Sequence, residues 1–327
     1  MRPLAVYADT GGADVSPGAA LLEEAGFDVR VLETDDGVAI ARDGADATAL
    51  LVSAAPVGGD LIASLPELRI VAAQSVGLDH VDLAAATARG IWVSNVPGAA
   101  SEEVAVHAFA MGLSLVRGLP AFDRALRAGR WFDVELALRR PSELTLGVCG
   151  LGRIGARVAA LGGAVYGRVL ATDPLVAEPP PGVELVGLDE LLRASDVLSL
   201  HVPLTPDTDH LIDAAAFVRM PAGAVVVNVS RGALIDPGAL LAALERGHIG
   251  GAALDVFETE PPAPGDALIA HPRVISSPHV AYYSDRAALT YVLEQARNVV
   301  AWLRTGRPLT PVGEPAGRTR GTGSRRT

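Results

Sequence analysis

Three kinds of side chain with complementary chemistry follow short apolar runs in the C-terminal half of the sequence: Arg231, the carboxylates Asp255 and Glu260, and His279. An arginine can hold the oxygens of a carbonyl and a carboxylate, and a histidine can donate a proton to a new alkoxide. A carboxylate, here Asp255 or Glu260, can orient that histidine and raise its pKa. Each residue alone has an ordinary reading: a surface arginine, a helix-capping acid or a loop histidine. Together they predict a site that binds and reduces a 2-keto acid.

A second pattern, GLGRIG, begins at Gly150 directly after the apolar run Leu144–Cys149 and opens a helical stretch. In this context Gly150 permits a tight turn, Gly152 lets a pyrophosphate approach the backbone, and Gly155 lets helix and strand pack closely. The N-terminus of the helix would offer free N–H groups to the phosphates. The pattern therefore predicts a dinucleotide site.

An acidic residue, Asp173, ends the next apolar run, 18 positions after Gly155. A carboxylate there would accept hydrogen bonds from the adenosine ribose and repel a 2′-phosphate, which favours NAD over NADP. Arg153 and Arg168 lie near enough in sequence to be a mild counterweight.

Short apolar runs alternate with stretches of helical composition along nearly the whole chain. Such runs are typical of strands covered on both faces, and the helices between them indicate parallel sheets. The sequence therefore predicts two α/β units in tandem, joined near Asn95–Gly98. The runs are Leu4–Ala8, Val29–Leu32, Ala49–Val52, Ile70–Ala73, Ile91–Val93, Leu144–Cys149, Val169–Ala171, Val197–Leu200, Ala224–Val229, Ala252–Val256 and Val274–Ile275.

A long helix is expected to begin at Ser101, whose hydroxyl could cap the first turn, while Glu102 and Glu103 suit the positive end of the helix dipole. Apolar residues surround the stretch Val104–Leu115 almost completely, which predicts burial between domains or against a partner subunit. A last helical segment covers Ala287–Leu303.

Composition excludes several classes of protein. The 327 residues are 50% apolar and 20% charged, which excludes a disordered chain, and the net charge of −11 argues against a nucleic-acid-binding surface. The one cysteine, Cys149, cannot form an intramolecular disulfide and is expected to be buried and inert. Apolar runs are too short for a membrane span, the N-terminus lacks a signal-peptide pattern, and the histidines show no metal-ligand spacing. We expect a soluble cytoplasmic protein without a metal.

Several motifs in this order resemble those of D-isomer-specific 2-hydroxyacid dehydrogenases, and the similarity runs from about Leu4 to Pro311. The motifs are Ser75-Val-Gly-Leu-Asp-His-Val-Asp, Asn95-Val-Pro-Gly, Gly150-Leu-Gly-Arg-Ile-Gly, His201-Val-Pro-Leu-Thr-Pro, Asn228-Val-Ser-Arg-Gly-Ala-Leu-Ile-Asp, Ala253-Leu-Asp-Val-Phe-Glu-Thr-Glu-Pro and Ser277-Pro-His.

The resemblance implies a particular domain plan. A discontinuous, flavodoxin-like substrate-binding domain would comprise residues 1–98 and 286–312, and a Rossmann NAD-binding domain, residues 99–285, would be inserted into it. The active site would lie in the cleft between them, and members are typically homodimers. Residues 313–327, rich in Gly, Pro, Thr, Ser and Arg, are expected to form a disordered tail.

The resemblance also assigns residues to roles. The catalytic set would be Arg231, Glu260 and His279. The substrate would meet backbone N–H groups around Ser75, Val76 and Gly77, together with Arg231 and Tyr282. Residues expected to contact NAD are Gly150, Gly152, Arg153, Ile154, Gly155, Asp173, His201, Val202, Pro203, Val229, Ser230, Arg231, Asp255 and His279.

Two stretches, the string that begins at Asn95 and the residues Val280–Asp285, depart from the phosphoglycerate-dehydrogenase type. They look closer to the C-terminal-binding-protein branch, whose members are NAD(H)-binding corepressors. Tyr282 stands where that branch has an aromatic residue protruding into the substrate pocket; the alternative is an aromatic that packs at a dimer interface. Val106 stands where many members have an acid. An NAD(H)-sensing corepressor-like protein with weak dehydrogenase activity is therefore the alternative function. An enzyme acting on phosphite or formate ranks lower, because neither offers a keto group for His279 to protonate.

Overall fold

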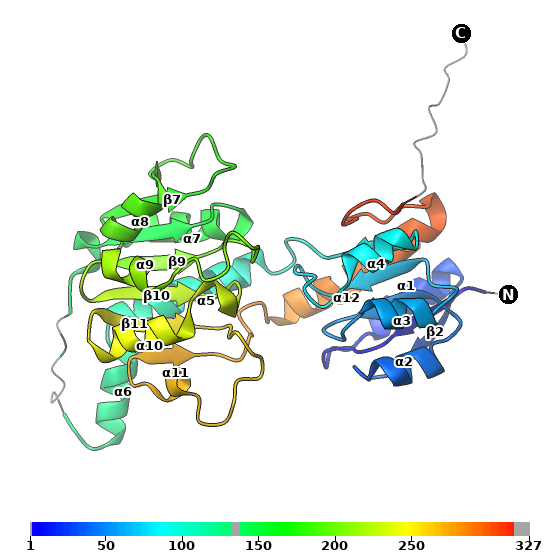
Figure 1. Cartoon of the computed structure of the whole chain (residues 1–327), viewed down its shortest axis with the longest axis horizontal. Helices are drawn as coiled ribbons and strands as arrows, with labels where there is room; N and C mark the ends of the chain where they lie inside the picture. Colours follow the sequence, from blue (N-terminus) through cyan, green and yellow to red (C-terminus); the bar gives the residue numbers. More distant parts are fainter. Residues whose placement is uncertain (1, 132–135, 137, 317–327) are drawn as a thin grey trace, which may run out of the picture. The chain divides into compact units, whose positions relative to one another are not determined.

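The computed structural model describes residues 2–131, 136 and 138–316. These residues form two compact units. The first unit combines the described residues up to Ala99 with those from Ser284 onward, and the second comprises Ala100–Tyr283. Figure 1 shows that each unit is a sheet with helices on both of its faces.

The first unit contains a five-stranded parallel sheet in the order β2-β1-β3-β4-β5. This is the flavodoxin-like order of a doubly wound sheet. The predicted fold of this unit is therefore confirmed, and the strand boundaries differ from the predicted runs by at most two residues. The strands are β1 (Leu4–Tyr7), β2 (Asp28–Val31), β3 (Ala47–Val52), β4 (Ile70–Ala73) and β5 (Trp92–Ser94).

Helices cover both faces of this sheet because its strands are apolar on both sides. One face packs against α1 (Ser16–Ala25) and α12 (Asp285–Thr305). The other packs against α2 (Gly37–Asp43), α3 (Gly59–Ser64) and α4 (Leu83–Ala88). The C-terminal helix α12 thus belongs to the same unit as the N-terminal strands, as Figure 1 shows.

The second unit contains a seven-stranded parallel sheet in the order β12-β11-β10-β9-β6-β7-β8. Counted from β6, this is the Rossmann order 3-2-1-4-5-6 with one strand added, so the predicted Rossmann fold is confirmed. The strands are β6 (Thr145–Cys149), β7 (Arg168–Thr172), β8 (Glu184–Leu185), β9 (Val197–Leu200), β10 (Ala224–Asn228), β11 (Ile249–Leu254) and β12 (Val274–Ser276).

Two layers of helix bury this sheet. The cluster on one face includes α5 (Ser101–Val116) and α7 (Arg153–Gly163). The cluster on the other includes α8 (Leu188–Ala194), α9 (Ala214–Arg219), α10 (Pro237–Glu245) and α11 (Ala267–Ala270). The remaining described helical segments are α6 (Leu119–Arg127) and the short 3₁₀ turns Pro141–Glu143 and Gly232–Leu234. Because all strands are parallel, their carboxyl ends share one edge, where ligands of such sheets bind.

Helix α5 begins at Ser101, as predicted, but the expected cap by the Ser101 hydroxyl is wrong. Ser101 is the first helical residue and Ala100 occupies the N-cap position, without a capping hydrogen bond from a side chain. Within its own unit the side chain of Val106 is 50% exposed, so burial of this helix between domains or against a partner subunit stays a prediction. Its buried face is lined by small residues such as Ala105, Ala108 and Gly112, which lets the helix lie close to the sheet.

The predicted disordered tail falls mostly outside the described residues. Its first four residues, 313–316, lie against the first unit: Pro315 is buried, and the Ala316 N–H donates to the Thr87 carbonyl at 3.0 Å. The remaining residues, 317–327, are not described.

Within the described part of the chain, no single helix has the length and apolar character to cross a membrane. Helices α5 and α6 meet this criterion only as a pair, and they are bent by 63° relative to each other.

Candidate active site

The three residues predicted to do chemistry lie at the carboxyl edge of the second sheet, after three neighbouring strands. Arg231 follows β10, Glu260 lies in the loop after β11, and His279 follows β12. Because these strands are adjacent and parallel, their carboxyl ends bring distant parts of the sequence together. The guanidinium charge of Arg231 acts on the titration of both Glu260 and His279, so the three groups share one electrostatic environment.

His279 and Glu260 form a direct pair. The Nδ1 atom of His279 lies 2.6 Å from Oε2 of Glu260, and Oε1 of Glu260 accepts the Phe257 N–H at 2.9 Å. Since an ionised carboxylate only accepts hydrogen bonds, Nδ1 carries the proton, and Nε2 is the atom that can exchange a proton with a substrate. The side chains are 46% and 35% exposed, which leaves the pair accessible.

The two partners shift each other's pKa in opposite directions. The hydrogen bond to Glu260 raises the pKa of His279, against the effects of burial and of Arg231, and the charge of Asp255 adds to the increase. Partial burial acts to raise the pKa of Glu260, but the hydrogen bonds from His279 and from the Phe257 N–H outweigh it and lower that pKa. The pair therefore keeps His279 protonated and Glu260 ionised together over a wider pH range than their ordinary pKa values would allow.

We expect Glu260→Gln to move the alkaline limb of the pH profile for keto-acid reduction to lower pH by about 1 unit. We expect reduction to require protonated His279, whose raised pKa keeps it protonated as the pH rises above the ordinary value. Without the carboxylate, that proton is lost at lower pH. The variant should therefore lose more activity at about pH 8 than at about pH 5.5. A uniform loss at all pH values would contradict this role.

Arg231 is positioned by the end of β10. Its carbonyl accepts the Asn228 Nδ2 hydrogen at 2.8 Å, and one guanidinium nitrogen, Nη1, donates to the Ser230 carbonyl at 2.7 Å. Ser230 in turn donates its hydroxyl to the Leu200 carbonyl at 2.8 Å, which ties the end of β10 to the end of β9. These bonds hold the base of the arginine at the edge of the sheet.

The glycine turn fits a bound dinucleotide. Gly150 has φ +93°, a conformation that favours glycine, and a Cβ there would lie 2.6 Å from the His201 carbonyl oxygen. A Cβ on Gly155 would lie 1.9 Å from the Gly150 carbonyl oxygen, so the third glycine is required by the packing of α7. At Gly152, by contrast, a Cβ would meet no protein atom within 4 Å. Gly152 is the N-cap of α7 without a side chain to cap it, which leaves room and backbone N–H groups for a phosphate.

Asp173, at the end of β7, is oriented by two backbone groups. Its Oδ2 accepts the Leu151 N–H of the glycine turn at 2.8 Å, and its Oδ1 accepts the Leu175 N–H at 2.9 Å. A carboxylate has about four acceptor sites, so both oxygens keep capacity for ribose hydroxyls. The acid is thus fixed to the same turn that would hold the pyrophosphate.

Alanine substitutions in and near the glycine turn should separate effects on stability from effects on cofactor binding. Gly155→Ala is expected to destabilise the protein by about 1–3 kcal/mol, because its Cβ overlaps the Gly150 carbonyl. Gly152→Ala should lower the melting temperature less than Gly155→Ala does and should weaken NADH binding, because its Cβ enters only the space for the phosphate. Gly163→Ala, in the same helix with no protein atom within 4 Å of its Cβ, is the control and should not weaken NADH binding. Thermal melts and NADH titration measure both effects; unchanged NADH affinity in Gly152→Ala would contradict the assignment.

The other residues expected to contact NAD lie around the point where the strand order reverses, between β6 and β9. His201 borders the glycine turn with its carbonyl, and a Cβ on Gly150 would also lie 2.9 Å from Val202 Cγ1. His201 is half-buried: its Nε2 bonds to Ser199 Oγ at 2.8 Å, and burial lowers its pKa to about 4. Contact of His201 with a cofactor stays a prediction. The remaining residues expected to contact NAD lie at the same edge of the sheet. They are Arg153 and Ile154 at the start of α7, Pro203 after β9, and Val229 and Ser230 after β10.

The structure shows a role of Asp255 that was not predicted from the sequence. Its carboxylate is 1% exposed and accepts hydrogen bonds from Ser277 Oγ at 2.5 Å, Val280 N at 3.0 Å and Ala281 N at 2.9 Å. The side chain thus holds the loop around His279, and contact with nicotinamide stays a prediction. His107, on α5, also belongs to this network, and the sequence showed no local signal for it.

The residues expected to bind the substrate carboxylate lie in the first unit, in the loop after β4. Ser75 Oγ donates to the Gly77 carbonyl at 2.6 Å, Asn95 Nδ2 donates to the Val76 carbonyl at 2.7 Å, and the Val96 N–H donates to the Ser75 carbonyl at 2.8 Å. The loop is therefore held at the carboxyl edge of its own sheet. In the second unit, Tyr282 is 38% exposed and packs edge-on against Tyr283.

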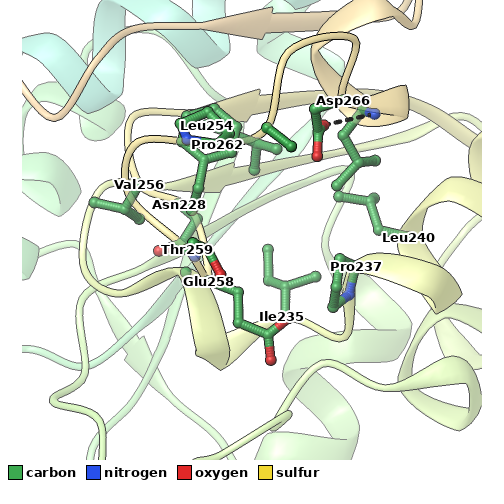
Figure 2. Close-up of a pocket in the computed structure, with 14 residues that line it drawn as sticks. Asn228, Ile235, Pro237, Leu240, Leu254, Val256, Glu258, Thr259, Pro262 and Asp266 are labelled. Carbon is green, nitrogen blue, oxygen red and sulfur yellow. Dashed lines mark hydrogen bonds between the residues drawn. The ribbon is translucent and has the colours of Figure 1, made fainter.

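A cavity of about 260 Å³ is lined in part by Glu258, Thr259 and Pro262, from the loop that carries Glu260 (Figure 2). Its walls are mainly apolar, and Glu258 and Asp266 add carboxylates to them. Arg231, Glu260 and His279 are not among its lining residues. Its lining residues are Asn228, Gly232, Ile235, Pro237, Leu240, Leu254, Val256, Phe257, Glu258, Thr259, Pro262, Ala263, Asp266 and Leu268.

The predicted burial of Cys149 is confirmed. The thiol is buried, and burial raises its pKa to about 12. Among the described residues, no group of three or more His, Cys, Asp or Glu side chains is arranged to hold a metal ion.

Comparison with known proteins gives a consistent result. Residues 109–281 match the model of the family described as D-isomer specific 2-hydroxyacid dehydrogenase, NAD binding domain. A glyoxylate reductase of Aeropyrum pernix is 39% identical over 253 residues, which are 74% of this chain and 76% of that protein. A D-3-phosphoglycerate dehydrogenase of Archaeoglobus fulgidus is 38% identical over 75% of this chain, but the match spans only 47% of that longer protein.

A solved structure extends the similarity over nearly the whole chain. The D-lactate dehydrogenase of Aquifex aeolicus, crystallised with NAD and lactic acid, superposes with a TM-score of 0.83. It is 31% identical, and the alignment covers 95% of this chain and all of that one.

Proposed function

Because this chain belongs to the D-isomer-specific 2-hydroxyacid dehydrogenase family, we propose that it catalyses reversible hydride transfer between NAD and a small D-2-hydroxy acid. The observation that carries the proposal is the His279–Glu260 pair, with its 2.6 Å hydrogen bond and its raised histidine pKa. Reduction of a carbonyl needs a proton donor for the new alkoxide, and this pair beside an arginine can supply one.

The residues then have distinct roles. When bound, NADH supplies the hydride for carbon 2 of the keto acid. His279 Nε2 donates the proton to the carbonyl oxygen as it becomes an alkoxide, and Glu260 stabilises the imidazolium before the transfer. Arg231 holds the carbonyl and carboxylate oxygens through its planar fork of donors. Backbone N–H groups of the Ser75–Gly77 loop would bind the substrate carboxylate, and Asp173 would bind the adenosine ribose.

The proposed substrates are small 2-keto acids, glyoxylate and hydroxypyruvate among them. The name of the Aeropyrum pernix relative supports glyoxylate as a candidate. Tyr282, which is 38% exposed and follows His279 by three positions in the sequence, is proposed to contact the substrate side chain and so to limit its size.

The test is NADH oxidation with glyoxylate, hydroxypyruvate and longer keto acids, with NADPH in parallel. We expect turnover of the short keto acids, a preference for NADH because of Asp173, and better turnover of longer acids by Tyr282→Ala. Tight NADH binding without turnover of any keto acid would overturn the proposal. It would favour the corepressor-like alternative, which no structural observation supports and which the names of the relatives above do not suggest.

We further propose that the protein is a cytoplasmic homodimer. Large apolar side chains are exposed on and just after α6: Leu119 and Leu126 are each 57% exposed, and Trp131 is 82% exposed. Such a group favours contact with a second copy of the chain. Leu126→Asp is expected to shift the mass in solution from dimer to monomer, while Leu175→Asp, at a leucine that is 92% exposed elsewhere in the same unit, should not. A monomeric wild type would contradict the proposed homodimer.

A further inference from the structure

A chain of hydrogen bonds connects α5 to the loop that carries the catalytic histidine. His107 Nε2 lies 2.9 Å from Ser277 Oγ, and Ser277 Oγ lies 2.5 Å from Asp255 Oδ1. His107 and Ser277 are 170 positions apart in the sequence, so the fold of the second unit creates this contact. The His107 side chain is 29% exposed, whereas that of Asp255 is 1% exposed.

The direction of these bonds follows from the number of protons. A distance of 2.5 Å between a hydroxyl and a carboxylate is typical of a charge-assisted bond, so the single hydroxyl proton of Ser277 points to Asp255. Toward His107, Ser277 can then only accept, and the proton of that bond belongs to His107 Nε2. His107 is therefore a donor, and its role depends on its tautomer.

Asp255 also accepts hydrogen bonds from the backbone around His279. Its carbonyl accepts the His279 N–H at 2.8 Å, while its carboxylate accepts the Val280 and Ala281 N–H groups at 3.0 and 2.9 Å. Three consecutive N–H groups thus bond to one aspartate. His279 itself has φ +52°, in the left-handed region that non-glycine residues rarely adopt, so its backbone needs such support.

We propose that His107 is a positioning residue: by donating to Ser277 it fixes the carboxylate of Asp255, which holds the backbone of His279 so that its imidazole meets Glu260. This inference rests on the proposed function for its kinetic consequences. Its structural content, the placement of the His279 ring beside Glu260, does not depend on turnover.

The charged groups that act on the titration of His279 are Glu260, Asp255 and Arg231, and Glu260 has the largest effect. If the His279 loop loses its support, the hydrogen bond to Glu260 weakens and the pKa of His279 falls toward its ordinary value. The pKa of His279 therefore reports its position, in a way that a general loss of stability does not.

The experiment compares His107→Leu, which removes the donor, with His107→Gln, whose amide N–H₂ can replace it. Met111→Leu is the matched control, since Met111 lies on the same helix with its sulfur 3.8 Å from Ser277 Oγ but donates no hydrogen bond. The full chain is labelled with ¹⁵N-histidine, the His279 resonance is assigned with His279→Gln, and its pKa is measured by NMR titration. kcat and KM for the best keto acid are measured in parallel.

We expect His107→Leu to lower the pKa of His279 by about 0.5–1 unit and kcat by about 10- to 100-fold, with little change in KM. His107→Gln should restore most of both values, and the control should match wild type. Ser277→Ala should resemble His107→Leu, and the double variant should be no worse than the more impaired single variant, because both act through one chain.

Wild-type values of kcat and of the His279 pKa in His107→Leu would overturn the proposal, as would equal losses in the leucine and glutamine variants. If His107→Leu does not fold, Ser277→Ala and His107→Gln provide the same comparison. Absence of turnover in wild type would refute the proposed function alone, because the NMR titration would still show whether His107 positions His279.

Discussion

Replacing His279 with glutamine is expected to lower kcat for keto-acid reduction by about 10²–10⁴-fold, the usual contribution of a general acid. Glutamine keeps a polar side chain of similar length but cannot deliver a proton to an alkoxide at neutral pH. Stopped-flow or steady-state measurement of NADH oxidation gives this value directly. Affinity for NADH, measured by fluorescence titration, should change little, since the glycine turn and Asp173 are unaffected.

The same substitution should also remove the pH dependence that the histidine creates. In wild type, reduction is expected to persist above the ordinary histidine pKa and then to fall as the pH rises through the raised pKa of His279. The residual activity of the variant should show no such limb. His271→Gln, at a histidine that accepts the Arg273 N–H outside the site, is the control. An alkaline limb retained in His279→Gln would assign the proton to another group.

Replacing Arg231 with glutamine is expected to lower kcat/KM by about 10³-fold, or about 4 kcal/mol of transition-state stabilisation. The loss should appear in both kcat and KM, because the guanidinium would bind the carboxylate in the ground state and the developing oxyanion in the transition state. Arg231→Lys retains the charge but not the planar fork, so it should recover no more than about tenfold.

Loss of Arg231 also affects the neighbouring pair. Its positive charge acts to lower the pKa of His279, so Arg231→Gln should raise that pKa further, and the alkaline limb of the residual activity should move to higher pH. Arg246→Gln, at an exposed arginine just after α10, is the matched control and should behave as wild type. A large fall in kcat without a change in KM would contradict binding of the substrate carboxylate by Arg231 in the ground state.

The parts of the site that could be predicted from the sequence are those with local causes. The turn around Gly150 requires a positive φ and Gly155 requires a close approach, so both are encoded by the absence of a side chain. Arg231, Glu260 and His279 follow three apolar runs, and parallel strands bring such positions to one edge. Short runs covered on both faces were sufficient to indicate two parallel sheets.

Long-range contacts could not be predicted in this way. His107 is a lone histidine on a mostly apolar helix, and only the packed structure shows that it meets Ser277. Asp255 has the spacing of a site residue, but its burial and its three bonds to the loop depend on β12 lying beside β11. The Ser101 cap was wrong because the helix begins one residue earlier than a cap at Ser101 would require, a boundary that local composition does not fix.

The most direct test of the central claim is the fate of the hydride. Wild-type protein is supplied with NADH carrying deuterium at C4 of the nicotinamide and with the keto acid that it turns over best, and the product is examined by mass spectrometry and chiral chromatography. The account predicts one deuterium on carbon 2 of a D-2-hydroxy acid, and loss of that product in His279→Gln. A hydroxy acid without deuterium at carbon 2, or full product formation by the variant, would contradict it.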